Sequence, residues 1–226
     1  MKKAVILLSG GLDSSTTLYY AKSKGYSCHC LIFDYGQRHK REIKSAKGIA
    51  KKANCESQVV KIQLPHKGSS LLDNSIAIPK NRDAARFKKG IPSTYVPGRN
   101  IIFLSFAVSY AEAIGAGAIF IGANAIDYSG YPDCRPEFFE AFKKVINTGT
   151  KVGSKRPSRG SRLGVKAPLI LKSKADIVRL ARRLKVPIEL TWSCYKGGET
   201  PCRVCDSCIL RAKGFKDAGL VDKYNG

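Results

Sequence analysis

Residues 9–15 form a glycine- and serine-rich segment whose composition suits the binding of phosphate groups. They read Ser-Gly-Gly-Leu-Asp-Ser-Ser and follow a short apolar segment. Glycine lets the backbone approach a phosphate closely, and the first turn of a helix offers unpaired N–H groups and a positive dipole end. No lysine follows the glycines, so this is not a Walker A loop. The segment predicts a pyrophosphate cradle; the alternative is an ordinary strand-to-helix turn with a serine cap.

Two further motifs place cationic side chains at the ends of predicted elements. Arg38 and His39 close the segment Asp-Tyr-Gly-Gln-Arg-His, at the end of the second predicted strand. They are candidates for the site, although a histidine there could equally cap a helix or lie in the core. Arg99 follows a Pro-Gly turn at the start of a predicted helix. It could bind a carboxylate or phosphate through paired hydrogen bonds; the alternative is an exposed arginine.

The segment from Gly122 to Phe138 combines acidic, aromatic and hydroxyl side chains in one loop. A carboxylate from Asp127 or Asp133 would accept hydrogen bonds from the N1–H and exocyclic amine of a guanine-like ring, and a tyrosine could stack on its face. Two carboxylates could instead bind a metal ion, and a polar turn is the third alternative. We interpret the loop as a binding site for a small ring.

Four of the eight cysteines crowd together near the C-terminal end of the sequence, at Cys194, Cys202, Cys205 and Cys208. Without a secretory signal, such crowding indicates a metal site and not disulfides. Four thiolates can complete a tetrahedral zinc site, which then has no open position and is structural. The alternatives are a redox-active Cys-x-x-Cys pair and an iron–sulfur cluster.

The apolar pattern predicts the elements that position these motifs. Strands are expected at residues 3–8, 26–33, 58–63 and 118–122, and helices at 14–24, 39–54, 99–114, 135–147 and 173–184, the last with Ser173 as its N-cap. This alternation predicts an α/β fold with a doubly wound parallel sheet, whose ligands bind outside the carboxyl ends of the strands. The pattern stops before the cysteines. We therefore expect a nucleotide- and substrate-binding domain at 1–190 and a small zinc-binding lobe at 191–226.

The overall composition is that of a folded, strongly basic protein. It has 226 residues, 43% of them hydrophobic, and a formal net charge of +23. A basic surface attracts nucleic acids, but the even spread of the charge favours a simple lysine-rich surface. The segment 151–166 concentrates basic residues and is expected to be a surface loop. No apolar run is long enough to span a membrane, and the N-terminal residues read as a buried strand, so we expect a cytoplasmic protein.

The motifs together resemble the 7-cyano-7-deazaguanine synthase family, within the pyrophosphate-loop superfamily of adenine-nucleotide alpha hydrolases. The resemblance rests on SGGLDSS, FDYGQRH, YVPGRN, DYSGYPDCRPEF, APLI followed by Lys174, and the cysteine cluster with a following arginine. It runs in order from Met1 to about Phe215 and is weakest in the basic segment 151–166. It implies a Rossmann-like α/β fold.

The resemblance also implies a reaction. Such an enzyme is an ATP-dependent carbon–nitrogen ligase that converts 7-carboxy-7-deazaguanine and ammonia to 7-cyano-7-deazaguanine, through an adenylated acid and an adenylated amide. The product serves queuosine or archaeosine synthesis in tRNA. The cofactors implied are ATP, Mg²⁺ and Zn²⁺. The partners are small molecules, with no direct need for nucleic acid, no membrane and a possible homodimer.

Two other functions remain open at this point. A related pyrophosphate-loop enzyme could modify tRNA directly, which the basic charge suits, although no added RNA-binding domain is evident. A zinc-ribbon binding module without catalysis would not need the pyrophosphate loop.

The resemblance assigns roles to individual residues of this sequence. Expected catalytic residues are Asp13, Ser14, Arg38, His39, Arg99 and Lys174. Expected nucleotide-binding residues are Leu8, Ser9, Gly10, Gly11, Leu12, Asp13, Ser14, Ser15, Thr16, Thr17 and Leu18. Expected substrate-binding residues are Arg99, Asn100, Asp127, Tyr128, Ser129, Tyr131 and Asp133. Expected metal ligands are Cys194, Cys202, Cys205 and Cys208.

Overall fold

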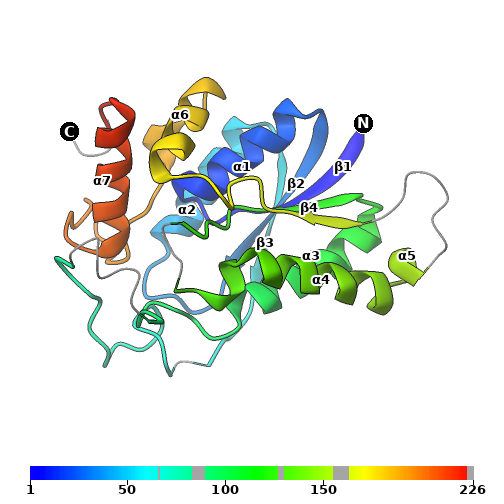
Figure 1. Ribbon diagram of the computed structural model, residues 1–226, viewed down its shortest axis with the longest axis horizontal. Coiled ribbons are helices and arrows are strands. Elements are labelled where there is room, and N and C mark those ends of the chain that lie inside the picture. Colours follow the sequence, from blue (N-terminus) through cyan, green and yellow to red (C-terminus); the bar gives the residue numbers. More distant parts are fainter. Residues whose placement is uncertain (66, 83–89, 127–129, 155–162, 223–226) are drawn as a thin grey trace.

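The computed structural model describes residues 1–65, 67–82, 90–126, 130–154 and 163–222. In this part of the chain a parallel sheet of five strands has the order β3-β2-β1-β4-β5 (Figure 1). The strands are β1 (Lys2–Leu7), β2 (Tyr26–Asp34), β3 (Glu56–Lys61), β4 (Ala118–Ile121) and β5 (Gly164–Lys166). The chain order reverses between β1 and β4, and ligands of such sheets bind beyond the carboxyl ends of the strands at this point.

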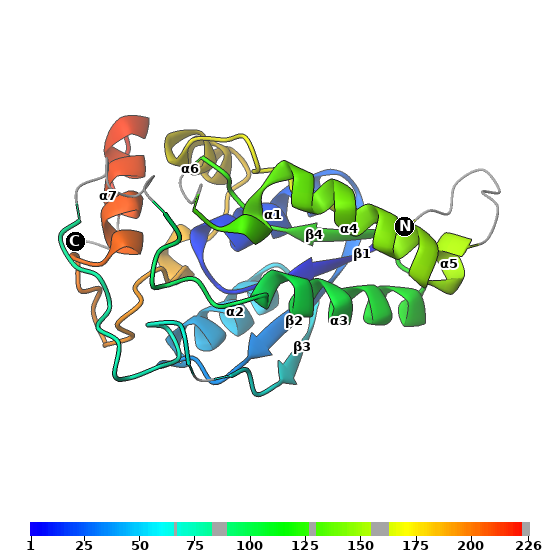
Figure 2. The same ribbon diagram turned by 60° about the horizontal axis from the view of Figure 1, so that its bottom comes forward.

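Helices cover both faces of the sheet, as the predicted doubly wound fold requires (Figures 1 and 2). One face carries α1 (Leu12–Ser23) and α2 (Arg41–Lys52). The other face carries α3 (Arg99–Ile114) and α4 (Pro136–Gly149). Because alternate residues of a strand point to opposite faces, the buried strands contribute side chains to a separate core on each side.

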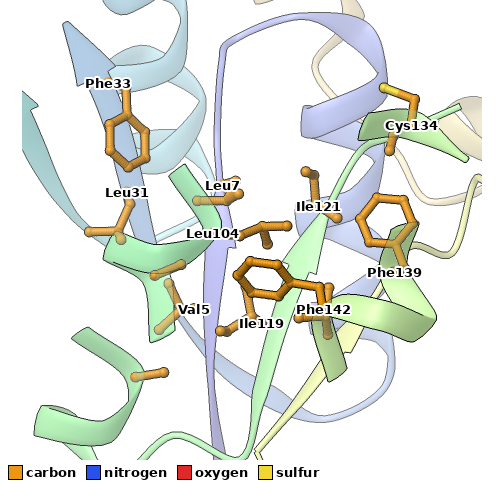
Figure 3. Close-up of a cluster of buried hydrophobic side chains, with 14 of the residues drawn as sticks. Val5, Leu7, Leu31, Phe33, Leu104, Ile119, Ile121, Cys134, Phe139 and Phe142 are labelled. Atoms are coloured by element: carbon orange, nitrogen blue, oxygen red, sulfur yellow. The ribbon is translucent and has the colours of Figure 1, made fainter. Parts of the chain in front are cut away.

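The core beneath α3 and α4 is the larger of these two clusters and lies close to the edge where ligands are expected. Val5 and Leu7 of β1 pack there with Ile119 and Ile121 of β4, beneath Leu104 of α3 (Figure 3). All of these side chains are buried. Burial of such aliphatic side chains contributes roughly 1.5–3 kcal/mol each relative to exposure, so the strand ends are held firmly.

A third layer of packing joins the C-terminal part of the chain to the sheet. The helices concerned are α6 (Lys174–Arg183) and α7 (Asp206–Ala218). They pack on each other through Ile177, Val178 and Phe215, and Leu12 of α1 joins the same cluster. Two short 3₁₀ helices, Pro132–Cys134 and Ile188–Leu190, lie in the connections. Ser173 caps α6 as predicted, because its hydroxyl accepts a hydrogen bond from the Asp176 N–H.

The sequence pattern missed two α-helices and one strand, besides the two short 3₁₀ helices. Helix α7 was not predicted because its inward positions include Cys208, Arg211 and Gly214, which break the apolar periodicity of a buried helix. The short helix α5 (Lys151–Ser154) and strand β5 lie at the two ends of the segment expected to be a surface loop. That expectation was wrong for both ends, and residues 155–162 lie outside the described part of the chain. Among the described residues, no helix combines the length and apolar character needed to cross a membrane.

Candidate active site

A cavity of about 250 Å³ opens at the carboxyl ends of β1, β2 and β4. It brings together residues that lie far apart in the sequence. The predicted residues that line it are Leu8, Ser9, Gly11, Leu12, Asp13, Ser14, Arg99, Asn100, Tyr131 and Lys174. Further lining residues, which sequence reasoning did not assign, include Tyr35, Glu42, Trp192, Ser193, Tyr195 and Ser207.

The glycine- and serine-rich segment at residues 9–15, the phosphate-type loop, leads directly from β1 into α1. The Ser9 and Ser14 hydroxyls lie 3.0 Å apart, and Ser14 also accepts a hydrogen bond from the Ser9 N–H at 3.2 Å. Gly11 is the N-cap of α1 and provides no side-chain cap. The first-turn N–H groups and two hydroxyl donors therefore gather at one end of the cavity, where an anion would be stabilised.

Two glycines are required for the backbone to close around this loop. Gly10 has φ +83°, and a Cβ there would lie 2.3 Å from the Glu42 carbonyl oxygen. Gly122, at the end of β4, lies against the start of α1, and a Cβ there would lie 2.8 Å from the Ser14 nitrogen. A side chain at either position would displace the loop.

The remaining residues of the predicted nucleotide-binding segment face away from the cavity. Ser15 and Thr16 donate hydrogen bonds to the carbonyl oxygens one turn earlier, each at 2.7 Å. Thr17 and Leu18 are fully buried within the fold. These four positions, together with Gly10, support the loop from behind and do not line the cavity.

Asp13 and Lys174 form an ion pair inside the cavity. The Lys174 Nζ donates to the two carboxylate oxygens of Asp13 at 3.0 and 2.8 Å, and both side chains are largely buried. The stem of Lys174 packs against Gly214 of α7, where a Cβ would lie 2.2 Å from the Lys174 Cγ. The C-terminal helix thus sets the position of a lysine that meets the phosphate-type loop.

Arg99 projects from the start of α3 into the same cavity. Its guanidinium donates to the Tyr35 hydroxyl at 3.5 Å and lies 6.0 Å from the centre of the Phe103 ring. Burial alone would lower the pKa of Arg99, but Tyr35, Tyr131 and the nearby Asp133 raise it above its ordinary value. The group is therefore a permanent cation in the cavity, suited to a carboxylate or phosphate.

Glu42 lies in the first turn of α2 and also lines the cavity. Sequence reasoning did not identify it. Its Oε1 accepts a hydrogen bond from the Gln37 Nε2 at 2.9 Å. Burial raises the pKa of Glu42 to about 7, although Arg99 and the Gln37 hydrogen bond act in the opposite direction. No spacing in the sequence marks this glutamate, because its meeting with the cavity depends on how α2 packs on the phosphate-type loop.

Asp133 has a different environment from the one expected of a substrate ligand. Its Oδ2 accepts from the Asn100 N–H at 3.1 Å, and the Asn100 side-chain amide donates to the Asp133 carbonyl oxygen at 3.1 Å. The carboxylate thereby caps the N-terminus of α3, is 5% exposed and does not line the cavity. The amide of Asn100, which also donates to the Cys134 Sγ, is likewise occupied.

Tyr131 lines the cavity, and its hydroxyl lies 2.7 Å from the Thr94 Oγ1. The other expected substrate ligands of this loop, Asp127, Tyr128 and Ser129, lie outside the described residues.

Arg38 and His39 are not brought to the cavity. Arg38 donates from Nη2 to the carbonyl oxygens of Asp73 and Ile76, the latter at 2.9 Å, so it holds the long connection after β3. His39 packs against Gly197, where a Cβ would lie 2.0 Å from the His39 Cβ. Both side chains contact neighbouring segments and do not line the cavity, so their catalytic role stays a prediction.

The four clustered cysteines have the geometry of a metal site. Their sulfurs all lie within 4.8 Å of one another, which compares with a separation of about 3.8 Å around a tetrahedral zinc ion with 2.3 Å Zn–S bonds. The N–H groups of Lys196 and Cys202 donate to the Cys194 Sγ at 3.4 and 3.3 Å. Hydrogen bonds from Cys205 and Cys208 lower the pKa of Cys194, whereas the same contacts raise the pKa of Cys208. The donor set fits zinc.

The segment that carries the cysteines packs closely against the rest of the molecule. The backbone N–H of Trp192 donates to the Gly10 carbonyl oxygen at 2.8 Å, which ties this segment to the phosphate-type loop. Arg82 forms an ion pair with the buried Asp206, next to Cys205. In Figures 1 and 2 the connection after β3 runs beside the cysteine segment, as the bridge between Lys80 and Cys205 shows.

A second buried ion pair holds the C-terminal residues. Arg211 of α7 donates from Nε and Nη2 to the two carboxylate oxygens of Asp222, at 2.7 and 3.1 Å. Its Nη1 donates to the Thr191 and Ser193 hydroxyls at 2.8 and 3.2 Å. These contacts hold the segment leading to the cysteines against α7, beside the cavity.

Comparison with known proteins identifies sequence relatives over nearly the whole chain. A model of the protein family described as queuosine biosynthesis protein QueC matches residues 3–219. The 7-cyano-7-deazaguanine synthase of Thermoplasma volcanium is 54% identical over 226 residues, which cover 99% of this chain and 91% of the relative. The enzyme of the same name from Nostoc punctiforme is 53% identical over 222 residues, covering 97% of each chain.

Solved structures of similar fold are more distant in sequence. The NMN synthetase of Francisella tularensis has a TM-score of 0.51 and 14% identity, over 99% of this chain and 80% of its own. A protein of Methanocaldococcus jannaschii described as a predicted subunit of tRNA methyltransferase has a TM-score of 0.50 and 14% identity, over 100% and 92% of the two chains. At these identities the similarity concerns the fold alone, and it agrees with the predicted Rossmann-like α/β class.

Proposed function

Because the chain belongs to the family of queuosine biosynthesis protein QueC, we propose that it converts 7-carboxy-7-deazaguanine and ammonia to 7-cyano-7-deazaguanine with ATP. The observation that carries the proposal is a single cavity lined by the phosphate-type loop, the Asp13–Lys174 ion pair and Arg99. These groups suit a reaction in which a carboxylate attacks the α-phosphate of a nucleotide and pyrophosphate leaves.

The chemistry explains why ATP is needed. A carboxylate is a poor electrophile, and transfer of AMP to one of its oxygens supplies a leaving group. In this step the bond between the α-phosphorus and the bridging oxygen breaks, and pyrophosphate departs. Ammonia then attacks the carbonyl carbon, AMP leaves with the former acid oxygen, and an amide results.

The amide retains one oxygen, which cannot leave as hydroxide near neutral pH. Transfer of a second AMP to this oxygen, with loss of a proton, makes it a leaving group. Departure of AMP and a further proton from nitrogen yields the nitrile. We therefore expect two ATP molecules to be consumed for each nitrile formed.

Different residues of the chain would serve different parts of this reaction. The α1 N-terminus, with Ser9 and Ser14, would bind the departing pyrophosphate and stabilise its developing charge. Lys174, positioned by Asp13, would carry positive charge to the reacting phosphate. Arg99 would orient the 7-carboxylate toward it, which supplies proximity. Mg²⁺, when bound, would neutralise phosphate charge beside Asp13, and zinc would be held by the four cysteines as a structural ion.

The competing proposal is direct modification of tRNA by a pyrophosphate-loop enzyme. The net charge of +23 suits it, but the cavity volume of about 250 Å³ suits small ligands.

A turnover assay with the free base separates these proposals. The purified protein is incubated with ATP, Mg²⁺, ammonia and 7-carboxy-7-deazaguanine in the absence of RNA, and AMP and nitrile are quantified. We expect nitrile with two AMP per product. Absence of AMP release without tRNA, together with release when tRNA is added, would overturn the proposal in favour of the RNA-directed enzyme.

A further inference from the structure

Glu42 is a carboxylate in the cavity that the steps above do not use. It lies in the first turn of α2, and its main-chain carbonyl packs against Gly10 of the phosphate-type loop. Glu42 lines the cavity together with Tyr35 and Phe103. An acidic group close to a predicted pyrophosphate site calls for a specific explanation, because it repels the phosphates.

The orientation of Glu42 is set by a buried glutamine. The Gln37 side chain is 7% exposed; its Oε1 accepts from the Tyr35 N–H at 2.8 Å and its Nε2 donates to the Phe33 carbonyl oxygen at 3.2 Å. The same Nε2 donates to the Glu42 Oε1 at 2.9 Å. Gln37 is thus fixed by the backbone of β2's end, and it holds one oxygen of the glutamate in place.

The other carboxylate oxygen of Glu42 has no partner among the residues that the structure describes. Within the same part of the chain, Glu42 forms no ion pair within 4.0 Å, and Arg99 acts on it only from a greater distance. The surrounding wall is largely apolar, with Leu7, Leu31 and Phe103. Glu42 is partly buried, and this oxygen remains open to the cavity. A ligand that fills the cavity must therefore supply a donor to it, since a polar group left unsatisfied in a dry site costs free energy.

We propose that Glu42 recognises the 7-deazaguanine ring of the substrate by accepting hydrogen bonds from its N1–H and 2-amino groups. This proposal rests on the proposed function and deepens it. The ring presents two adjacent donors on one edge, which a carboxylate can accept with its two oxygens or with one oxygen shared. Asp133 is the acidic candidate on the described part of the loop after β4. Its carboxylate accepts a hydrogen bond from the Asn100 N–H at the start of α3 and does not line the cavity.

The adenine ring of ATP is the other base that could meet Glu42. Its edge presents one amine donor beside the N1 acceptor, so a carboxylate would gain one hydrogen bond there and place a negative oxygen near a lone pair. The guanine-type edge therefore matches Glu42 better. The neighbouring Arg99 cation is then available for an acceptor of the same substrate, its ring oxygen or its 7-carboxylate.

The test is a binding experiment with the full-length protein in its zinc-loaded form. Dissociation constants of the wild type and the Glu42→Gln variant are measured for 7-carboxy-7-deazaguanine, for an analogue that lacks the 2-amino group, and for ATP alone. Glutamine keeps the size of the side chain but replaces an acceptor oxygen with a donor. We expect the variant to bind the natural acid at least tenfold more weakly, to lose most of its preference over the analogue, and to bind ATP within twofold of the wild type.

The matched control is Glu140→Gln, which changes an exposed glutamate on α4 that pairs with Lys143. It should leave all three constants unchanged. Retained ATP binding and a cooperative thermal transition, with a midpoint no lower than that of the wild type, show that Glu42→Gln is folded; if it is not, Glu42→Asp, which keeps the charge but shortens the side chain, is measured in its place.

The outcomes distinguish a failure of the role proposed for Glu42 from a failure of the proposed reaction. An unchanged preference for the 2-amino group, or a loss confined to ATP affinity, would overturn the role of Glu42 while leaving the proposed reaction intact. A wild-type protein that neither binds the free acid nor releases AMP with it would instead overturn the proposed function itself.

Discussion

At the scale of single residues, the cavity depends on charged groups that are positioned by partners far away in the sequence. Asp13 meets Lys174 across most of the chain, and Glu42 is held by Gln37 next to the phosphate-type loop. Each charged group has a partner that limits its rotamers. Such preorganisation matters because groups that are already oriented need no rearrangement when charge develops in the transition state.

Replacing Asp13 or Ser14 with alanine should lower the rate of pyrophosphate release at least a hundredfold while leaving the fold intact. Asp13→Ala removes the partner of Lys174, and Ser14→Ala removes a hydroxyl from the loop; loss of one such donor costs on the order of 10²–10³ in kcat. A pyrophosphate-release assay measures the effect. Ser23→Ala, at the exposed end of the same helix, is the control and should match the wild type. Near-normal release in both active-site variants would remove the loop from the mechanism.

Glu42 should make the ligand-free protein less stable as the pH rises. Its pKa is about 7 in the folded protein, above its ordinary value of 4.5, so the folded state binds more protons than the unfolded state between these values. The stabilisation is therefore present below pH 4.5 and is lost as the pH rises through 7. Between pH 5 and pH 8, the free energy of unfolding of the wild type should fall by on the order of 2 kcal/mol more than that of the Glu42→Gln variant. Chemical denaturation of both proteins at the two pH values measures this difference. Parallel pH dependence of the two proteins would contradict the assignment.

At the scale of elements, helix α7 connects the cysteine segment to the cavity. Its first turn carries Cys208 and its middle carries Arg211 and Gly214. Arg211 holds the segment at Thr191, whereas Gly214 leaves room for the stem of Lys174. One face of a single helix thus serves the metal site, the connecting segment and the cavity.

Gly214→Ala should reduce turnover at least tenfold by displacing Lys174 from Asp13. The added Cβ would lie 2.2 Å from the Lys174 Cγ, so the lysine stem or the helix must move. A shift of about 1 Å can cost on the order of a hundredfold in rate. Gly48→Ala is the matched control, because Gly48 also lies in a helix but its Cβ would meet nothing within 4 Å. That variant should keep full activity and gain up to about 1 kcal/mol of stability. Equal activity of the two variants would show that α7 does not position Lys174.

At the scale of the whole molecule, the cavity lies where the α/β sheet meets the C-terminal residues. The phosphate-type loop comes from the sheet, while Trp192, Ser193 and Tyr195 come from the segment that leads into the cysteine cluster. Metal binding in this region should therefore affect both stability and the cavity, since the binding energy of a structural metal is folding energy.

We expect one zinc ion per chain, bound by the four clustered cysteines. Elemental analysis of the purified protein measures it, and iron in place of zinc would contradict the assignment. Cys202→Ser should lose the metal and lower stability by several kcal/mol. Cys55→Ser, which changes a half-buried cysteine outside the cluster, is the control and should retain the full zinc content. Metal removal should also weaken ATP binding, because Trp192 ties this region to Gly10.

The large positive charge should contribute little to turnover of the free base. Replacing Lys155, Arg156, Arg159 and Arg162 together with neutral residues should change kcat/KM for the deazaguanine acid less than threefold, or under about 0.7 kcal/mol. Steady-state kinetics at fixed ionic strength measure this. A hundredfold loss would show that the basic segment takes part in the active site.

The sequence alone determined the features whose chemistry depends on local order. The glycine–serine segment, Arg99 after its Pro-Gly turn and the four cysteines could be identified because each requires particular residues at short spacings. The alternation of strands and helices likewise predicted the α/β class, since the apolar pattern of each element reflects the face it buries.

The tertiary structure alone decided which of the remaining polar groups reach the cavity. Asp133 looked like a substrate ligand in the sequence, but its carboxylate accepts a hydrogen bond from the start of α3; Arg38 likewise donates to distant carbonyl oxygens. Glu42 had no signature, yet packing of α2 on the loop brings it into the cavity. The physical reason is that a buried polar group must find a hydrogen-bond partner, and that partner is set by chain packing and not by neighbours in the sequence.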